Sequence, residues 1–482
     1  MKKEQFAGMK VLIMGLGLNG GGLESARYLA LKGADLSVTD LRDEKTLAPS
    51  IEKLEAGLGG IPVRWILGRH EVSDFEKADM VIKNPGVHPD SPYLKAARRI
   101  ETDISLFLAA SPGRLTAVTG SKGKSSTASA LYWTLNKARE EGLLTGKARL
   151  GGNITVSPLT FLDELEPCDD VVLELSSWQL GDLKGRLKED GSALLKPRAA
   201  VLTAIMPDHL DRYGTMEAYV ADKRIIYQNQ DGGDVTVAGD DSWGRSFHRE
   251  SRGRPLVYAE APLAENVPGG WLANKDGPAM ARLRDIQGKN SGTGAVVEAV
   301  PSQPLVPGYH QKKNLLAAAL ALLDLGLPAE FVRKSLGTFP GIEHRLEFFH
   351  ESKGVKWYND SAATIPEAAA AAVAAFPSPP VLVAGGTDKN LDFSPLVKAA
   401  AGTKAVILLA GTGSEKLRRL MDAAGIQYQG PFDSATAAAS AAAGAASPGD
   451  TVVFSPGCTS FGMFLNEFDR GCKWKEGVRK LG

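Results

Sequence analysis

The sequence predicts an α/β protein with mainly parallel sheets, divided into three domains. Short apolar runs alternate with helical patterns along the chain, which is typical of strands joined by crossover helices. The 482 residues are too many for one hydrophobic core, and at about 150 residues per domain they indicate three. Turn-rich segments at 111–113 and 339–341 are the expected linkers. We therefore expect domains at 1–112, 113–339 and 340–482.

Expected strands recur in all three domains. They are residues 11–14, 36–39, 80–83, 115–119, 171–175, 199–204, 355–358, 381–384, 405–409 and 451–454. Two alanine-rich segments, 367–375 and 435–446, are expected to be packed helices because alanine is the best helix former. The polar, glycine-rich segment 260–294 predicts an irregular or β-rich insert.

Composition narrows the class of protein. Lysine plus arginine equals aspartate plus glutamate, at 56 each, so the net charge draws the chain toward neither nucleic acid nor an anionic membrane. The three cysteines lack Cys-x-x-Cys spacing, which fits the reduced thiols of a cytosol. The first residues lack a signal peptide's apolar core, and no apolar run is long enough to span a membrane. We expect a soluble cytoplasmic enzyme, a monomer without nucleic-acid or membrane partners.

The first glycine-rich loop, Gly15 to Gly20, follows the strand expected at 11–14, and Asp40 ends the next strand. A tight turn opening a helix can accept a diphosphate, and the carboxylate can accept a hydrogen bond from a ribose or a base. NAD satisfies this pattern, and a nucleotide-diphosphate substrate satisfies it equally well. A purely structural glycine turn is a third interpretation.

A second loop follows the strand at 115–119 and predicts use of ATP. It consists of Gly120, Ser121, Lys122, Gly123, Lys124, Ser125 and Ser126. Glycines let backbone N–H groups converge on phosphate oxygens, a lysine adds a positive charge, and a hydroxyl can bind Mg²⁺. Only two residues separate Gly120 from Gly123, which is more compact than the common phosphate-binding pattern.

Polar residues follow several other expected strands, where parallel sheets bind ligands. Glu174 ends one strand, and Asp208-His209 follows the strand at 199–204. A carboxylate there can hold a metal, whereas histidine alone is ambiguous because magnesium prefers oxygen. Lys223 lies in a helical pattern, and nothing local distinguishes it from a solvated lysine.

In their order along the chain, these motifs resemble the Mur ligases of peptidoglycan synthesis, over essentially the whole sequence. The segments that carry the resemblance are 120–126, 151–153, 174–179, 208–213, Lys223, 308–314, 344–345, 359–361 and 385–389. The first loop, Asp40 to Arg42, Asn84 to Gly86 and Gly385 to Lys389 are most similar to members that join D-glutamate to UDP-N-acetylmuramoyl-L-alanine. The resemblance implies a Rossmann-like N-terminal domain, a central P-loop ATPase-like domain and a Rossmann-like C-terminal domain.

The resemblance also implies a role for each matching residue. The UDP substrate would contact Leu18, Asn19, Asp40, Arg42, Gly86, Asn153, Ser176 and Gln179. ATP would contact the loop 120–126 together with Asn314, Arg345 and Asp360, and D-glutamate would contact Lys389 and Ser460. Mg²⁺ would be held by Ser125, Glu174, His209 and a carbamylated Lys223, and the catalytic residues would be Lys124, Glu174, His209 and Lys223.

Three positions depart from the family pattern. Gln311 and Ala362 stand where many members have asparagine and lysine, and Glu467 replaces a usual aromatic. These differences concern mainly the amino-acid pocket. The alternatives left open are a related ligase for another amino acid, a folylpolyglutamate synthase, an NAD-dependent dehydrogenase that uses the first loop, and a nucleotide-gated binding protein.

Overall fold

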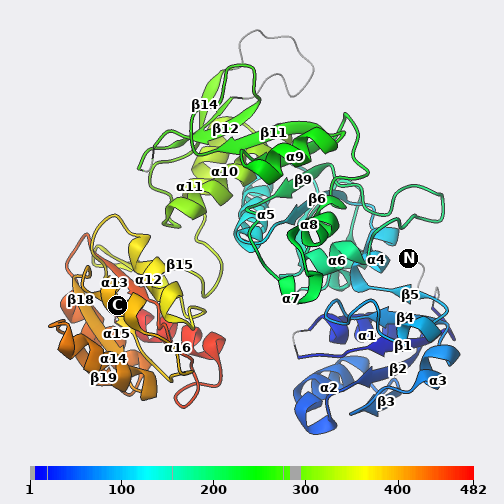
Figure 1. Ribbon diagram of the computed structural model, residues 1–482, viewed down its shortest axis with the longest axis horizontal. Coiled ribbons are helices and arrows are strands. Elements are labelled where there is room, and N and C mark those ends of the chain that lie inside the picture. Colours follow the sequence, from blue (N-terminus) through cyan, green and yellow to red (C-terminus); the bar gives the residue numbers. More distant parts are fainter. Residues whose placement is uncertain (1–5, 19, 155, 275, 283–294, 482) are drawn as a thin grey trace. The chain divides into compact units, whose positions relative to one another are not determined.

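The computed structural model describes residues 6–18, 20–154, 156–274, 276–282 and 295–481, and the chain forms two compact units (Figure 1). The first unit comprises residues up to Trp271 with Met280–Ala299 and Leu316–Val332, and the second comprises Leu272–Ala279, Val300–Leu315 and Arg333 onward. Among the helices in these described ranges, none is long and apolar enough to cross a membrane.

Five parallel strands form the first sheet, in the order β3-β2-β1-β4-β5. They are β1 (Lys10–Met14), β2 (Asp35–Asp40), β3 (Val63–Leu67), β4 (Met80–Lys83) and β5 (Ile100–Glu101). The helices are α1 (Gly21–Leu31), α2 (Glu44–Leu58), α3 (Val72–Lys77), η1 (Leu94–Ala96) and α4 (Asp103–Ala110). Because the strand order reverses between β1 and β4, the loops after these two strands border the crevice where open α/β sheets bind ligands.

Nine strands form the second sheet, in the order β14-β13-β12-β11-β10-β9-β6-β8-β7. They are β6 (Arg114–Thr119), β7 (Ala148–Gly152), β8 (Asp170–Glu174), β9 (Ala199–Leu202), β10 (Val235–Gly239), β11 (Arg254–Ala259), β12 (Gly269–Leu272), β13 (Ala279–Arg282) and β14 (Val296–Val300). The strands from β12 to β7 are parallel, with β6 between β9 and β8. The loops that follow these parallel strands therefore lie along the same edge of the sheet.

Helices accompany this second sheet and cover its apolar strands. They are α5 (Lys124–Glu140), η2 (Pro158–Glu164), α6 (Ser177–Gly181), α7 (Leu210–Tyr213), α8 (Met216–Arg224), α9 (Ser242–Glu250), α10 (Tyr309–Asp324) and α11 (Ala329–Gly337). All five residues of β8 are buried, as expected for a central parallel strand covered on both faces.

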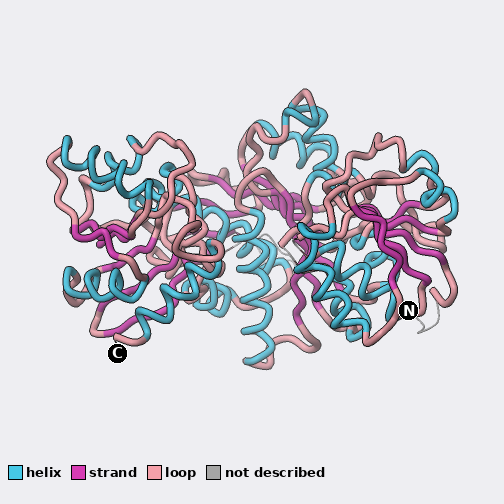
Figure 2. The backbone as a smooth tube through the Cα atoms, turned by 90° about the horizontal axis from the view of Figure 1, so that it is seen from below, coloured by secondary structure: helices cyan, strands magenta, loops and turns pink. Residues whose placement is uncertain are grey.

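The third sheet lies in the second unit, in the order β15-β16-β20-β17-β18-β19. Its strands are β15 (Glu347–Ser352), β16 (Val355–Asn359), β17 (Val381–Ala384), β18 (Ala405–Leu409), β19 (Gln429–Phe432) and β20 (Thr451–Phe454), with only β15 antiparallel to its neighbour among these described strands. Its helices are α12 (Pro366–Ala374), α13 (Ser394–Ala400), α14 (Thr412–Ala423), α15 (Ala435–Ala445) and α16 (Glu467–Arg479). They pack in two apolar layers, one on each face of the sheet (Figure 2).

The α/β class with mainly parallel sheets is confirmed, and so are both alanine-rich helices, α12 and α15. The strand predicted at 199–204 is too long: it ends at Leu202, because Ala204 turns to pair with Lys122 of the second glycine-rich loop. The insert is β-rich in its described part, where it contains β12 and β13, whereas 283–294 lie outside the described residues. The boundaries at 112/113 and 339/340 stay predictions.

Candidate active site

The loop between β6 and α5 is built around glycine. Gly120 has φ +148°, and a Cβ there would lie 2.0 Å from the Thr203 hydroxyl oxygen. The Ser121 N–H donates to the Ala204 carbonyl at 2.8 Å, which holds the loop against the end of β9. Helix α5 begins directly after the loop, so its first N–H groups can face an anion. The predicted order of strand, glycine-rich loop and helix is present.

Two polar side chains of this loop are engaged within the protein. The Lys124 ammonium donates to the carbonyls of Gly120 at 3.0 Å and Ser121 at 3.1 Å. The Ser121 hydroxyl donates to the Met206 carbonyl at 2.8 Å and lies 2.9 Å from the Tyr219 hydroxyl. Lys124 therefore lies over its own loop, and the Ser121 side chain fixes the loop's position.

Glu174, at the end of β8, carries a buried acceptor that suits a cation. The residue is 1% exposed, and its Oε1 accepts a hydrogen bond from the Asn153 Nδ2 at 2.9 Å. Its Oε2 is buried without a hydrogen-bond partner among the described residues. Because buried polar atoms are almost always paired, this oxygen fits a ligand for a hard cation such as Mg²⁺.

Lys223, on α8, is buried beside the same loop, so its interpretation as a solvated lysine is wrong. It is 1% exposed, and its Nζ donates to the Gly120 carbonyl at 2.9 Å. Burial, followed by the charge of Lys124, lowers the pKa of Lys223 to about 7. A large neutral fraction at neutral pH follows, and no local sequence signal could reveal it because the burial comes from tertiary packing.

His209 stands at the start of α7 with φ 52°, an uncommon backbone conformation for a residue other than glycine. Its ring centroid lies 4.9 Å from that of Trp178 and 6.3 Å from that of Tyr219. The aromatic neighbours orient the imidazole near the segments that carry Glu174 and Lys223. A carboxylate and a serine hydroxyl supply the oxygen ligands that magnesium prefers, an imidazole is a less usual ligand for it, and an unmodified ammonium cannot bind it.

The structure brings most of the predicted UDP-binding residues together. A cavity of about 410 Å³ is lined by Leu18, Asp40, Arg42 and Gly86, among others. The Asp40 carboxylate accepts hydrogen bonds from the N–H groups of Gly17 at 3.2 Å and Arg42 at 2.9 Å, which ties the two loops together. Asn19 lies outside the described residues.

A second cavity, of about 340 Å³, adjoins the first and shares Asn84 and Gly86 with it. On its other side it is lined by Asn153, Ser176 and Gln179 from the second sheet. The Gln179 N–H donates to Ser176 Oγ at 3.2 Å and the Ser176 N–H to Gln179 Oε1 at 3.0 Å, a capping box at the start of α6. We name the two cavities together the substrate groove.

In the second unit, Arg345 and Asp360 lie near one another. Asp360 is 8% exposed and accepts hydrogen bonds from Ser455 Oγ at 2.6 Å and the Leu346 N–H at 3.1 Å. Burial raises the pKa of Asp360 to about 7, and the charge of Arg345 partly offsets this. Asn314, on α10, donates from its Nδ2 to Gln311 Oε1 at 3.1 Å.

The loops after β17 and β20 are paired, and this places the segments of Lys389 and Ser460 side by side. The N–H of Thr387 donates to the carbonyl of Thr459 at 3.1 Å, and the reverse bond measures 3.0 Å. Ser460 is buried, whereas Lys389 is exposed. Both residues therefore lie at the carboxyl edge of the third sheet.

Three family models match the chain in sequence order. They are the Mur ligase MurD-like N-terminal domain over residues 9–105, the Mur ligase middle domain over 118–322 and the Mur ligase glutamate ligase domain over 344–458. The chain belongs to the Mur ligase family. The first match assigns the Gly15 to Gly20 loop to a Mur ligase domain rather than to a dehydrogenase.

Similar Mur ligases align over nearly their whole length. UDP-N-acetylmuramoylalanine--D-glutamate ligase of Roseiflexus sp. is 41% identical, with 97% of each chain covered. The protein of the same name from Treponema pallidum is 41% identical with 98% of each covered, and that from Borreliella afzelii is 37% identical with 100% of each covered.

Solved Mur ligase structures share the three-domain α/β fold. UDP-N-acetylmuramate-alanine ligase MurC of Thermotoga maritima gives a TM-score of 0.55 at 18% identity, covering 98% of this chain and 100% of that one. MurF ligase of the same organism, in complex with ADP, gives 0.53 at 18% identity, covering 100% and 97%.

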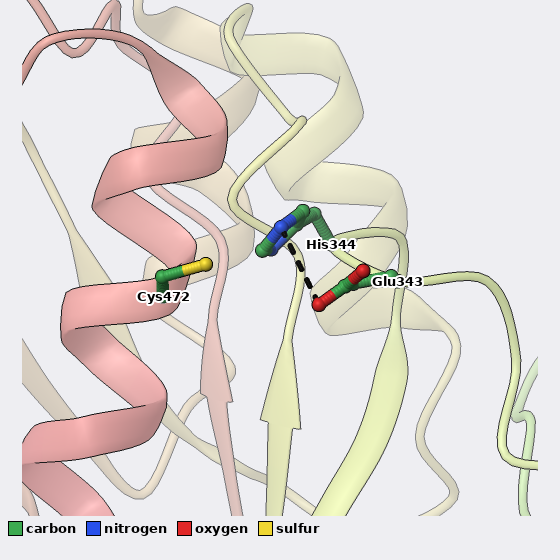
Figure 3. Close-up of side chains that lie close together, drawn as sticks. All are labelled: Glu343, His344 and Cys472. Carbon is green, nitrogen blue, oxygen red and sulfur yellow. Dashed lines mark ion pairs between the residues drawn. The ribbon is translucent and has the colours of Figure 1, made fainter. Parts of the chain in front are cut away.

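This Mur ligase also brings His344, from one of the segments that carry the family resemblance, together with Glu343 and Cys472, with one possible ligand atom from each within 4.8 Å of the others (Figure 3). The Asn359 Nδ2 lies 2.8 Å from His344 Nδ1 and donates to Glu347 at 2.9 Å. Its Oδ1 accepts the N–H of Ser361, so the amide orientation is fixed and His344 Nδ1 is an acceptor.

The same hydrogen bonds indicate whether this cluster of Glu343, His344 and Cys472 is suited to bind a metal. With Nδ1 accepting, the proton of the neutral imidazole is on Nε2, which faces Glu343 Oε1 at 3.8 Å. Glu343 also accepts from the Lys475 ammonium at 2.6 Å. The cluster therefore fits a hydrogen-bonded connection between the His344-Arg345 loop and α16 better than a metal site.

Proposed function

We propose that this Mur ligase uses ATP to join D-glutamate to UDP-N-acetylmuramoyl-L-alanine. One structural observation carries the proposal: Glu174 connects the phosphate loop to the substrate groove. Its strand pairs with β6, which leads into the loop, and its carboxylate binds Asn153, which lines the groove. Relatives 41% identical over nearly the full chain, named for this reaction, support the choice of substrates.

The reaction needs ATP because a carboxylate is a poor acyl donor. A substrate carboxylate oxygen attacks the γ-phosphorus of ATP, the bond to the β–γ bridging oxygen breaks, and ADP leaves. The amine of D-glutamate then attacks the acyl phosphate, phosphate leaves, and the amine loses a proton. Lys124 stabilises the charge on the transferring group. Alignment of the three reactants contributes roughly 7 to 11 kcal/mol.

We assign Mg²⁺ to Ser125, Glu174, His209 and Lys223. Bound there, it would neutralise phosphate charge and polarise the γ-phosphoryl group. Carbamylation of Lys223 turns an amine into an oxygen ligand, and only the neutral amine can attack carbon dioxide. A pKa of about 7 supplies that neutral form at physiological pH.

The remaining ligands are assigned mainly to residues in the loops at the carboxyl ends of the strands. The UDP substrate contacts Leu18, Asn19, Asp40, Arg42, Gly86, Asn153, Ser176 and Gln179 in our proposal. ATP contacts the residues from Gly120 to Ser126, together with Asn314, Arg345 and Asp360, and D-glutamate contacts Lys389 and Ser460.

The test is a phosphate-release assay. The purified protein is given ATP, Mg²⁺ and UDP-N-acetylmuramoyl-L-alanine, with D-glutamate, L-glutamate, L-lysine or meso-diaminopimelate in parallel. We expect release with D-glutamate alone. Release with another amino acid instead would contradict the substrate assignment, and NADH formation without ATP use would contradict the reaction class.

A further inference from the structure

A buried ion pair crosses between the first and second sheets at the substrate groove. Lys83 ends β4 and lines the groove, and its side chain is 3% exposed. Asp182 caps the C-terminal end of α6, and its side chain is 11% exposed. Their charged atoms lie 2.8 Å apart.

The ammonium group of Lys83 also binds the turn that follows β4. Its Nζ donates to the Val87 carbonyl at 3.1 Å and to the Asn84 carbonyl at 3.4 Å, in addition to its ion pair with Asp182. Both carbonyls belong to the turn that holds Gly86. Because its ammonium holds these two carbonyls, Lys83 can act on the substrate by positioning this turn.

Asp182 connects this turn to the opposite wall of the groove. Helix α6 is only five residues long, and it begins at the capping box formed by Ser176 and Gln179, which line that wall. The Asp182 N–H donates to the Trp178 carbonyl at 3.1 Å, so the residue is fixed to the helix. A shift of Asp182 therefore moves Ser176 and Gln179 with it.

We infer that the Lys83–Asp182 ion pair is a positioning device that sets the spacing between the two walls of the substrate groove. The inference rests on the proposed function only for the identity of the nucleotide substrate. Removing one partner leaves an unpaired buried charge, whereas replacing both with apolar residues leaves none. The effects of replacing Lys83 and of replacing Asp182 on substrate binding should therefore be strongly non-additive.

A second ion pair provides a matched control. Arg186 Nη2 and Glu101 Oε2 lie 2.5 Å apart and also join the segment after α6 to the first sheet. They line a different cavity, of about 480 Å³, that contains none of the predicted substrate-binding residues. If the Lys83–Asp182 pair acted only by holding the two sheets together, disrupting the Arg186–Glu101 pair would weaken substrate binding to the same extent.

The experiment compares Lys83→Met, Asp182→Leu, the double variant and Arg186→Gln. We expect each single change at the Lys83–Asp182 pair to raise KM for UDP-N-acetylmuramoyl-L-alanine about tenfold or more, with kcat and KM for ATP within about threefold. The double variant should raise KM about tenfold less than the product of the two single effects. Arg186→Gln should leave KM for the nucleotide within about twofold.

Equal KM values in wild type and a folded Lys83→Met variant would overturn the inference, and so would an equal rise in Arg186→Gln. If Lys83→Met does not fold, the double variant, which has no unpaired charge, decides: additive effects on KM would overturn the inference. Wild-type turnover with D-glutamate tests the proposed function separately, because it involves no variant.

Discussion

Burial gives individual side chains of this protein unusual proton affinities. Lys223 has a pKa of about 7 and Asp360 also has a pKa of about 7, in each case mainly because burial disfavours the charged form. Perturbed groups of this kind concentrate at functional sites. Both residues lie among those assigned to ATP and its metal, so their burial supports the proposed chemistry.

The Lys223→Met variant should gain stability and lose turnover. The pKa of Lys223 falls from 10.5 in the unfolded chain to about 7 in the fold, so between these values the unfolded chain holds more protons and stability rises with pH. Below pH 7 the full cost of burying the charge is present. Methionine removes it, so we expect up to roughly 5 kcal/mol of added unfolding free energy at pH 6, vanishing above about pH 10.5.

Denaturant unfolding in buffer free of carbon dioxide measures this effect, with the exposed Lys184→Met as control, for which a change within about 0.5 kcal/mol is expected. Loss of stability in Lys223→Met at pH 6 would contradict the account. Lys223→Ala should regain part of its turnover with added propionate, since a carboxylate can replace the oxygens of the proposed carbamate. Full activity in Lys223→Ala without propionate would remove Lys223 from the site.

The sequence predicted the residues that depend on local pattern and missed those that depend on packing. Glycine spacing and strand ends indicated Gly120, Lys124 and Glu174 directly. The assignment of Lys223 came only from family resemblance, because its burial arises from contact between α8 and the loop after β6, more than 100 residues away. The Lys83–Asp182 pair has no local pattern for the same reason.

At the level of secondary-structure elements, the turn between β6 and α5 depends on the close approach of its backbone to the segment that contains Thr203. The Gly120 position has both a positive φ and no space for a side chain, since a Cβ there would lie 2.0 Å from Thr203 Oγ1. Thr203, on the other side of the clash, directly follows β9 and belongs to the segment that leads toward His209. A displaced turn would therefore disturb together the residues that we assign to phosphate and to the metal.

Gly120→Ala should weaken ATP binding more than tenfold and lower the unfolding free energy by about 2 kcal/mol or more, because the clash adds to the backbone strain. Gly142→Ala is the control: its φ is +73°, but nothing lies within 4 Å of its Cβ position. We expect about 1 kcal/mol of destabilisation there and unchanged ATP binding. Calorimetric titration with ATP measures the affinity of each variant, and denaturant unfolding measures its stability. Equal affinities for ATP in the two variants would refute the role of the clash.

Ten of the twenty described strands were predicted as apolar runs between turns, and β3 and β7 are among those that were not. Strand β7 ends in Gly151-Gly152, and β3 is interrupted by the exposed Arg64, so neither forms an uninterrupted apolar run. Both lie at edges of their sheets, where burial on two faces is not required.

At the scale of the whole molecule, three sheets present loops at their carboxyl ends, and the proposed ligands divide among them. The UDP end is assigned to the first sheet, the phosphates and metals to the second, and D-glutamate to the third. The order of family models along the chain matches this division. Together, these assignments require that the protein transfers the γ-phosphoryl group of ATP to a substrate carboxylate.

An isotope-transfer experiment tests that claim most directly. UDP-N-acetylmuramoyl-L-alanine carrying heavy oxygen in its alanyl carboxylate is incubated with the protein, ATP, Mg²⁺ and D-glutamate, and the released phosphate is examined by mass spectrometry. The account predicts one heavy oxygen in each phosphate released and one new amide per ATP consumed. Phosphate without heavy oxygen, formed from unlabelled water, would contradict it and indicate hydrolysis of ATP instead.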